Sequence, residues 1–547
     1  MHLLQNLSRR DGVLILIGAS CVYILTTFLH RGFDSMPSIV INSGLPTYHT
    51  PAPILDLGFA KLPETGIIAH APGWTLFRNL YMSNGTLFLL SSNFSDFPEI
   101  RMMTSTGLPA YNTPENIALR EPTKQDMDFI SPEEAEAHWG GHAQDGERNR
   151  IWTVEGNTML FNDPSQFLDH YYHFVAELLV GARAFIYGAF NPTSRLSLAK
   201  DASTPELHPT FNPLPSVYEP PSFSRAIFIH AESYGWRDKP GFNSFVLRSA
   251  FPSLTIEVAS DWADRVNATA PPKAIDKDAV QHSRANDDDN DSRRAWHFPI
   301  ALLTDRSAAF RGESCGSRTQ RTASEAWEYM VDQGGIDLVG TWWNNVREAV
   351  WRFAGVKKQV FHSRRRPDEV NDSANENLQM KLPIPENIVI TYVSRQEVRR
   401  HLIPEDHDAL VDALRNLVKR KKVEEGKDWE LNIVRPEMFS KDGQIQLIAK
   451  STILLGVHGN GLTHLVFMKP SQVSAVIEIF YPGGFAHDYE WTTRALGMRH
   501  FTVWNDTYFT RPNEPSIGYP EGFQGTSIPV HGETVAQLIE DRLEGRL

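Results

Sequence analysis

The stretch TILLGVHGNGLTHL, residues 452–465, decides the fold of this chain, because it joins a buried strand to a helix through a glycine-rich turn. Similar apolar runs lie on both sides of it, in IVITYVS (388–394), ELNIVRP (430–436), SAVIEIFY (474–481) and HFTVW (500–504). Amphipathic segments such as PEDHDALVDALRNLVKRKK (404–422) separate these runs. Strands that alternate with helices need crossover connections, so the pattern predicts a mostly parallel α/β sheet covered on both faces.

Polar side chains follow these strands at the edge where an open parallel sheet binds its ligands. Arg395 comes after the first strand, His458 and Asn460 come after TILLGV, and Glu478 lies near the end of SAVIEIFY. An arginine and the N–H groups of a glycine turn suit a diphosphate, and a carboxylate suits two ribose hydroxyls. The pattern predicts a nucleotide-diphosphate site. Each residue also has a structural interpretation, as a surface ion pair, a turn histidine or an internal hydrogen bond.

A second candidate site lies in SQFLDHYYHFVAELLVGARAFIYGAF, residues 165–190, which is predicted to be a helix. His170, His173 and Glu177 stand at i, i+3 and i+7, so a helix would carry them on one face. His173 or Glu177 could act as a general base that removes the proton of an attacking hydroxyl. Two imidazoles and a carboxylate could also bind a metal ion, and a structural pairing beside an aromatic core is the third interpretation.

The charge balance argues against a nucleic-acid partner. The chain has 66 acidic and 53 basic residues and a formal charge of −13, so its surface would repel a phosphate backbone. The run DDDND (287–291) lies in the polar stretch 273–294 with no strand before it, so a solvated insertion explains it better than a metal motif. Asp305 and Arg306, after the strand IALLT, are further candidates of low specificity.

The amino-terminal residues predict a single-pass membrane anchor. Residues 1–11 form a short cytosolic tail with Arg9 and Arg10, and the apolar segment 12–30 is long enough to cross a thin bilayer as a helix. No small-x-small cleavage pattern follows it, so an uncleaved type II anchor is favoured over a cleaved signal peptide. Residues 31–62, which are rich in Pro, Ser, Gly and Thr, would form a stem.

This orientation places the remainder of the chain in the lumen of the endoplasmic reticulum or the Golgi. Six N-x-S/T sequons follow the predicted anchor, and such sites are glycosylated only in the lumen. The chain has two cysteines, Cys21 in the anchor and Cys315 beyond it, so no disulfide can close within the lumenal part. Its stability must therefore come from a large core.

Polar segments divide this lumenal part into two predicted domains. Residues 63–363, with the polar insertion 273–294, would form an N-terminal Rossmann-like domain on the acceptor side. The proline-marked stretch 364–387 is predicted to be a linker. Residues 388–547 would form a second Rossmann-like domain that ends in the helix TVAQLIEDRLEGR.

A family resemblance is carried by four segments, which are HYYHFVAELLVGARAF (170–185), ITYVSRQEVRRHLIPEDHDALVDAL (390–414), GVHGNGLTHLVFMKPS (456–471) and VIEIFYPGG (476–484). They resemble glycosyltransferase family 61, which includes plant β-1,2-xylosyltransferases and lumenal O-linked N-acetylglucosaminyltransferases of animals. The similarity covers roughly Trp152 to Asp506. It implies an α/β fold of the GT-B type, with two Rossmann-like domains facing a cleft, a nucleotide-sugar donor on the C-terminal domain, and inversion at the anomeric carbon.

The resemblance also implies roles for individual residues. One set would contact the diphosphate: Arg395, Arg399 or Arg400, His458, Gly459, Asn460 and Gly461. Glu478 would bind the ribose of uridine. Arginines and a helix dipole can neutralise the leaving diphosphate, so the resemblance implies no metal and no cofactor other than the UDP-sugar substrate.

The sequence thus predicts a type II membrane protein of the Golgi or endoplasmic reticulum that acts as an inverting glycosyltransferase. It would move xylose or N-acetylglucosamine from a UDP-sugar to a hydroxyl of a glycan or glycoprotein. One alternative is a metal-dependent lumenal hydrolase that uses His170, His173 and Glu177. The other is a sugar-binding protein of the same fold without catalytic activity.

Overall fold

The structure is a computed structural model. It describes residues 57–58, 60–141, 146–190, 220–270, 294–315, 321–333, 342–357 and 382–547. Four predicted segments lie partly or wholly outside the described residues and stay predictions. They are the anchor 12–30, most of the stem, residues 273–293 of the insertion and residues 364–381 of the linker. Within the described ranges, no helix has both the length and the apolar character needed to cross a membrane.

The sheet near the carboxyl terminus confirms the predicted parallel α/β pattern. Its strands are β10 (Val389–Val393), β11 (Glu430–Val434), β12 (Ile453–Val457), β13 (Ala475–Ile479), β14 (Arg499–Trp504) and β15 (Thr507–Phe509). They pair in the order β11-β10-β12-β13-β14-β15, and all neighbours are parallel except β14 and β15. The antiparallel strand β15 was not predicted, because a three-residue strand is too short to show a hydrophobic period.

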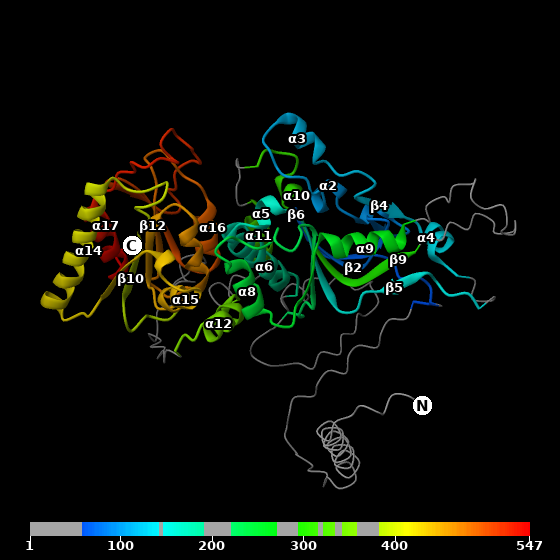
Figure 1. The fold of residues 1–547 in the computed structure, drawn as a ribbon, viewed down its shortest axis with the longest axis horizontal. Helices are drawn as coiled ribbons and strands as arrows, with labels where there is room; N and C mark the ends of the chain where they lie inside the picture. The colour runs from blue at the N-terminus through cyan, green and yellow to red at the C-terminus, as the bar shows by residue number, and fades with distance from the viewer. Residues whose placement is uncertain are drawn as a thin grey trace, which may run out of the picture. The chain divides into compact units, whose positions relative to one another are not determined.

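Helices cover both faces of this sheet, because its strand residues alternate between two buried layers. Its helices are α14 (Pro404–Glu425), η5 (Pro436–Met438), α15 (Lys441–Ile448), η6 (Asn460–Phe467), α16 (Asp488–Ala495) and α17 (Gly532–Leu543). Ile453 and Leu455 of β12 pack with α14 and α17, whereas Leu454 packs with α15, η6 and α16 (Figure 1). The helix predicted after the glycine turn is a 3₁₀ helix.

The sheet of the amino-terminal half combines a parallel and an antiparallel part. Its strands are β1 (Gly66–Ala71), β2 (Trp74–Ser83), β3 (Thr86–Leu90), β4 (Met127–Ile130), β5 (Ile151–Thr153), β6 (Asn157–Pro164), β7 (Arg225–His230), β8 (Thr255–Glu257) and β9 (Ala295–Thr304). Strands β9-β6-β7-β8 are parallel, as in a Rossmann-like sheet, and β2 joins the other edge of β9 in the antiparallel sense. This half is therefore a mixed sheet.

The described part of the amino-terminal half contains twelve helices, some of which link the two sheets. They are η1 (Phe94–Asp96), α2 (Ile100–Met103), α3 (Pro114–Leu119), α4 (Pro132–Trp139), α5 (Ser165–Leu168), η3 (Tyr172–Leu179), α6 (Val180–Ala189), α8 (Phe242–Ala250), α9 (Ala259–Thr269), α10 (Arg306–Phe310), α11 (Arg321–Asp332) and α12 (Asn344–Phe353). One hydrophobic cluster continues from Trp74 through η3, α6 and α12 to Leu454 and Val476 of the second sheet. Residues Leu55–Leu547 accordingly form one compact unit, and the two-domain GT-B layout stays a prediction.

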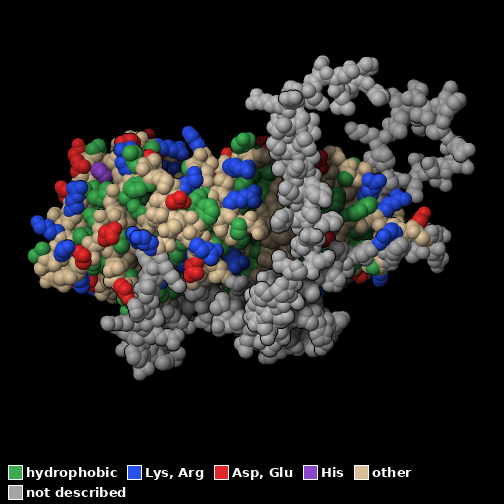
Figure 2. Space-filling model, turned by 60° about the horizontal axis from the view of Figure 1, so that its bottom comes forward, with side chains coloured by type: hydrophobic (Ala, Val, Ile, Leu, Met, Phe, Trp, Pro, Cys, Tyr) green, Lys and Arg blue, Asp and Glu red, His purple; other side chains and the backbone are tan. Residues whose placement is uncertain are grey.

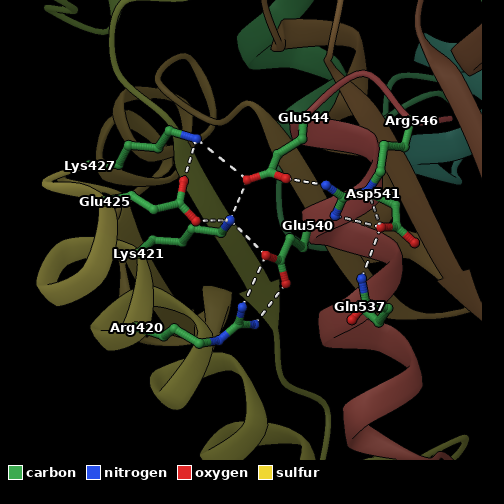
Figure 3. Close-up of polar contacts among 9 residues, drawn as sticks. All are labelled: Arg420, Lys421, Glu425, Lys427, Gln537, Glu540, Asp541, Glu544 and Arg546. Carbon is green, nitrogen blue, oxygen red and sulfur yellow. Dashed lines mark hydrogen bonds and ion pairs between the residues drawn. The ribbon is translucent and has the colours of Figure 1, made fainter.

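The terminal helix α17 docks on α14 through a network of ion pairs around Lys421 (Figure 3). The ammonium group of Lys421 contacts Glu425 and Glu540 at 2.6 Å and also contacts Glu544, while its side chain is only 1% exposed. Burial alone would lower the pKa of Lys421, but these hydrogen bonds raise it above its ordinary value. Among the described residues, these three glutamates are the group whose spacing could suit a metal ion, and Lys421 already supplies a cation to all three.

We expect Lys421→Met to destabilise the protein by at least about 2 kcal/mol, because it removes one partner of a buried charge cluster and leaves the carboxylates to repel each other. Urea denaturation followed by circular dichroism measures the change. The matched control is Arg415→Met on the same helix, whose side chain is 64% exposed and pairs with Asp412. Equal stability of the two variants would contradict the role given to Lys421.

Candidate active site

Buried charged side chains gather at the carboxyl ends of parallel strands in both sheets, whereas the outer surface carries a mixture of side chains. The face in Figure 2 shows basic, acidic and hydrophobic side chains interspersed. At the carboxyl ends of β6, β9 and β13, however, the side chains of Asp163, Arg306 and Glu478 are almost fully buried. Burial of an unpaired charge costs free energy, so each of these groups needs a partner. The partners therefore determine which chemistry the site can carry out.

Arg306 is the centre of the charged group on the amino-terminal side. It begins α10 directly after β9, and its guanidinium is 1% exposed and lies over the ring of Phe167. Its Nε lies 3.3 Å from Asp163 Oδ2, and its Nη1 forms an ion pair with Glu177 Oε2. Burial would lower the pKa of Arg306, but the two carboxylates raise it, so the guanidinium stays charged. Asp305 instead caps α10 and is held by Ser105.

The helix that carries His173 and Glu177 differs from the prediction. Residues Tyr172–Leu179 form a π-helix between two α-helices, and π-helical turns are frequent at functional sites. His173 Nδ1 lies 2.8 Å from Glu177 Oε2. His170 precedes the π-helix in a bend, with its ring centroid 4.9 Å from that of His173. The structure therefore brings the three predicted residues together, although not by the predicted α-helical spacing.

The tautomer of His173 follows from the charge of Glu177. Burial tends to raise the pKa of Glu177, but Arg306 and His173 lower it below its ordinary value, so the carboxylate is ionised and accepts a hydrogen bond. In a neutral His173 imidazole, this hydrogen bond requires the proton on Nδ1, and Nε2 is then the acceptor of the ring. The His173 side chain is 24% exposed, so this arrangement presents a basic nitrogen in a partly open position.

The glycine turn after β12 closely contacts Arg395. Nη1 of Arg395 donates to the carbonyl oxygen of His458 at 2.9 Å. Gly459 has φ +149°, and a Cβ atom there would lie 1.5 Å from the same nitrogen, so only glycine fits. Within the described part of the chain, the N–H groups of Gly459, Asn460 and Gly461 donate to no acceptor. The turn thus combines three N–H donors with a cation, which suits an anionic ligand.

Arg399 and Arg400 extend this cationic region. Arg399 is exposed, whereas Arg400 is partly buried and has φ +59°, a left-handed conformation that is strained in a residue other than glycine. Nε of Arg400 is buried with no hydrogen-bond partner among the described residues. Burial lowers the pKa of Arg395 and of Arg400, and the arginines lower it further through mutual repulsion. An anion placed between them would remove this repulsion.

Glu478 lies behind His458 rather than at an open surface. It is 0% exposed, one carboxylate oxygen bonds to His458 Nδ1, and the other lies 2.8 Å from His500 Nε2. Burial raises the pKa of Glu478 and lowers the pKa of His458, so each shift favours an uncharged form. Both carboxylate oxygens of Glu478 already face an imidazole, and the contact with ribose stays a prediction. The geometry instead gives Glu478 the position of a residue that orients His458.

Asp488 is a charged residue of the site that the sequence analysis missed. It begins α16, its side chain is 14% exposed, and Oδ2 lies 3.8 Å from His458 Nε2. Burial raises the pKa of Asp488 to about 7, and the nearby charge of Glu177 adds to this rise. The signal that could have found it is its place at a helix start after β13, on the ligand-binding edge of the sheet.

Hydrogen bonds join the two halves of the site. The N–H group of Tyr172 donates to Asn460 Oδ1 at 3.2 Å, and the Tyr172 hydroxyl donates to the carbonyl oxygen of Asp488 at 2.7 Å. Tyr171 makes a third contact, from its hydroxyl to His464 Nδ1 at 3.0 Å. The π-helix that carries His173 is thereby fixed against the glycine turn. Asn460, predicted as a ligand contact, also accepts a hydrogen bond from Thr463.

A cavity of about 660 Å³ lies at the opposite edge of the second sheet. Its lining includes Val389, Glu430 and Thr452, which stand at the amino ends of the strands or just before them. In parallel sheets, ligands bind beyond the carboxyl ends of the strands. None of the predicted site residues lines this cavity, so it is separate from the candidate site.

These features define an α/β protein with a glycine turn beside an arginine and a histidine–carboxylate pair at the carboxyl edges of two sheets. The family model described as Glycosyltransferase 61 matches residues 171–476, more than half of the chain. The chain therefore belongs to the glycosyltransferase 61 family, and this membership supports glycosyltransferase activity. The matched range contains His173, Glu177, Arg395 and the glycine turn, and it ends before Glu478. A comparison with curated proteins finds no significant match.

We expect Asp488→Asn to gain stability relative to the wild type as the pH rises from about 4 to 7. The pKa of Asp488 is raised from 3.8 to about 7 in the folded state. Between these two pH values the folded state binds a proton that the unfolded state has lost, so the wild type loses stability as the pH rises. The variant lacks this loss, so the difference in the free energy of unfolding grows by up to about 4 kcal/mol.

Urea denaturation at pH 5, 6 and 8 measures this difference. Asp412→Asn, at a side chain that is 71% exposed, is the matched control and should show no such trend. The raised pKa would be contradicted if the free energies of unfolding of Asp488→Asn and the wild type differed by the same amount at every pH.

Proposed function

We propose that this protein is an inverting glycosyltransferase that moves a sugar from a UDP-sugar to a hydroxyl of a glycan or glycoprotein. Xylose and N-acetylglucosamine are the donor sugars that the family resemblance suggests, and nothing in the sequence separates them. The observation that carries the proposal is the hydrogen bond between Tyr172 N–H and Asn460 Oδ1, because it places the helix of His173 beside the glycine turn. A basic nitrogen and an anion-binding turn are the two parts that such a transfer requires.

The diphosphate of the donor would bind to the cationic side of the site. Arg395, Arg399 and Arg400 supply positive charge, and the turn at Gly459 supplies N–H donors. As the sugar leaves, negative charge develops on the phosphate oxygen of the broken bond, and fixed cations and donors stabilise that charge. These groups could take the place of a divalent cation, so we propose a reaction that needs no metal.

His173 would act as the general base on the acceptor side. Its Nε2 takes the proton of the acceptor hydroxyl while that oxygen attacks the anomeric carbon from the face opposite the diphosphate. The new carbon–oxygen bond forms as the bond to the phosphate oxygen breaks, and the electron pair leaves with the diphosphate. Glu177 holds the tautomer and stabilises the imidazolium that forms, and Arg306 keeps Glu177 ionised.

No specific observation favours the metal-dependent alternative. His173 Nδ1 and Glu177 Oε2 bond to each other, and Oε2 is also paired with Arg306. Within the described ranges, His170, His173 and Glu177 do not form a group with the spacing of metal ligands. The location in the Golgi or endoplasmic reticulum, with a type II anchor at residues 12–30, remains part of the proposal and rests on the sequence alone.

We expect UDP to raise the melting temperature of the full chain, purified in detergent, with EDTA present, because a ligand that binds only the folded state stabilises it. At 100 times its Kd the gain is about 2.7 kcal/mol, and Arg395→Ala should abolish it. Differential scanning fluorimetry provides the measurement. Arg415→Ala, on the outer surface of α14, should respond to UDP like the wild type. A response that depends on a divalent cation would contradict the proposed metal-independent site.

We expect His173→Ala to lower kcat for sugar transfer by about 10²- to 10⁴-fold, because it removes the general base. The Kd for UDP should stay unchanged, since His173 lies on the acceptor side. Transfer from radiolabelled UDP-xylose and UDP-N-acetylglucosamine to a panel of glycans measures the rate, and titration calorimetry measures the Kd. The exposed His531→Ala is the matched control. Full transfer activity in His173→Ala would show that another group is the base.

A further inference from the structure

A loop of the carboxyl-terminal half crosses the ligand-binding edge beside the cationic turn. Gly518 pairs with Phe485 through two backbone hydrogen bonds of 3.0 and 3.1 Å. Further along the loop, the carbonyl oxygen of Gly525 accepts a hydrogen bond from the N–H group of Arg400 at 2.9 Å. The loop 518–525 is therefore fixed at one end to the segment after β13 and at the other end to the arginine segment.

Close packing holds this loop in position. Gly522 has φ +99°, and a Cβ atom there would lie 2.8 Å from the ring of Tyr481. On the other side, a Cβ atom on Gly484 would lie 2.6 Å from the ring of Phe523. The backbone thus passes so near to two aromatic rings that neither glycine can be replaced without a shift. Such a loop presents its remaining side chains in a fixed orientation.

An aromatic series leads from His458 out to solvent along this loop. The ring of Phe523, which is 4% exposed, lies 5.4 Å from the ring of His458. Tyr519 packs against Phe523 at 5.1 Å and at 86°. In contrast to Phe523, Tyr519 is 52% exposed. The exposed ring of Tyr519 is therefore separated by a single ring, that of Phe523, from His458 in the turn that would hold the diphosphate.

We infer that Tyr519 is the platform on which the nucleobase of the donor stacks. The inference rests on the proposed function, since it needs the diphosphate at Arg395 and Gly459. In a nucleoside diphosphate the ribose separates the base from the phosphates. The base therefore contacts a surface beside the turn that holds the diphosphate, and not the turn itself. Tyr519 offers a flat, exposed ring in that place, and Phe523 supports it from behind. Base–aromatic stacking needs only such a ring.

The same ring is less suited to the acceptor. Tyr519 belongs to the loop that bonds to Arg400, on the side of the second sheet, whereas His173 and Arg306 come from the first half of the chain. The acceptor hydroxyl must reach His173. A ligand that contacts both Tyr519 and the arginines is therefore the donor nucleotide.

Titration calorimetry with UDP and with inorganic pyrophosphate, on the full chain in detergent, tests the inference. Tyr519→Ala should weaken UDP binding by about 5- to 150-fold, which corresponds to the loss of one stacked base. It should leave pyrophosphate binding unchanged, because pyrophosphate has no base. Tyr519→Phe keeps the ring and should bind UDP within about threefold of the wild type. Tyr234→Ala, at an aromatic side chain that is 86% exposed in the other half of the chain, is the matched control.

The outcomes separate this inference from the proposed function. If the wild type binds UDP and Tyr519→Ala binds it equally well, the nucleobase lies elsewhere and the inference is overturned, while the proposed function stands. If Tyr519→Ala weakens UDP and pyrophosphate alike, the substitution has disturbed the diphosphate turn, and the assignment of a base platform fails. If the wild type binds no UDP at all, both the platform and the UDP-sugar donor are overturned.

Discussion

The hydrogen bond from the Tyr172 N–H group to Asn460 joins two segments that are 288 residues apart in the chain. Neither half of the candidate site is complete without this contact. The π-helix contributes the histidine–carboxylate pair, and the second sheet contributes the glycine turn with Arg395. The contact can be maintained because a continuous hydrophobic cluster underlies it, which runs from Trp74 to Val476. Packing of the two halves therefore comes first, and the chemistry of the site depends on it.

Much of the second sheet could be predicted because each of its five parallel strands is a short apolar run between helices. Residues inside such strands are buried on both faces, which gives a signal that tertiary contacts do not override. The same reasoning explains why the sequence left two interpretations of Glu478 open, a ribose contact and an internal hydrogen bond. A residue near the end of a strand can point into the covering layer as easily as toward the edge, and here it points inward, between His458 and His500. Sequence position alone does not distinguish these two directions.

The amino-terminal side of the site was harder to predict, because its charges come from separate elements. Asp163 ends β6, Arg306 follows β9, and Glu177 lies on the π-helix, and only the tertiary fold brings the three together. The α-helical spacing of His173 and Glu177 did predict that they would be close, since residues four apart also meet on the π-helix. It did not predict Arg306 as their partner, and without this cation a fully buried Glu177 would not stay ionised.

The two sides of the site differ in how their charges are balanced, and this difference suits the site to one kind of ligand. On the side of His173 the buried cation Arg306 is paired with Asp163 and Glu177, so its charge is balanced within the protein. On the side of the glycine turn the arginines repel each other, and Nε of Arg400 has no partner among the described residues. The first group thus carries its own counter-charges, as a base and its orienting residues should, and Oε1 of Glu177 is its one oxygen that is buried without a hydrogen-bond partner among the described residues. In the proposed reaction the diphosphate of the donor would supply the missing negative charge to the second group, and relief of the repulsion between the arginines would add to the free energy of binding.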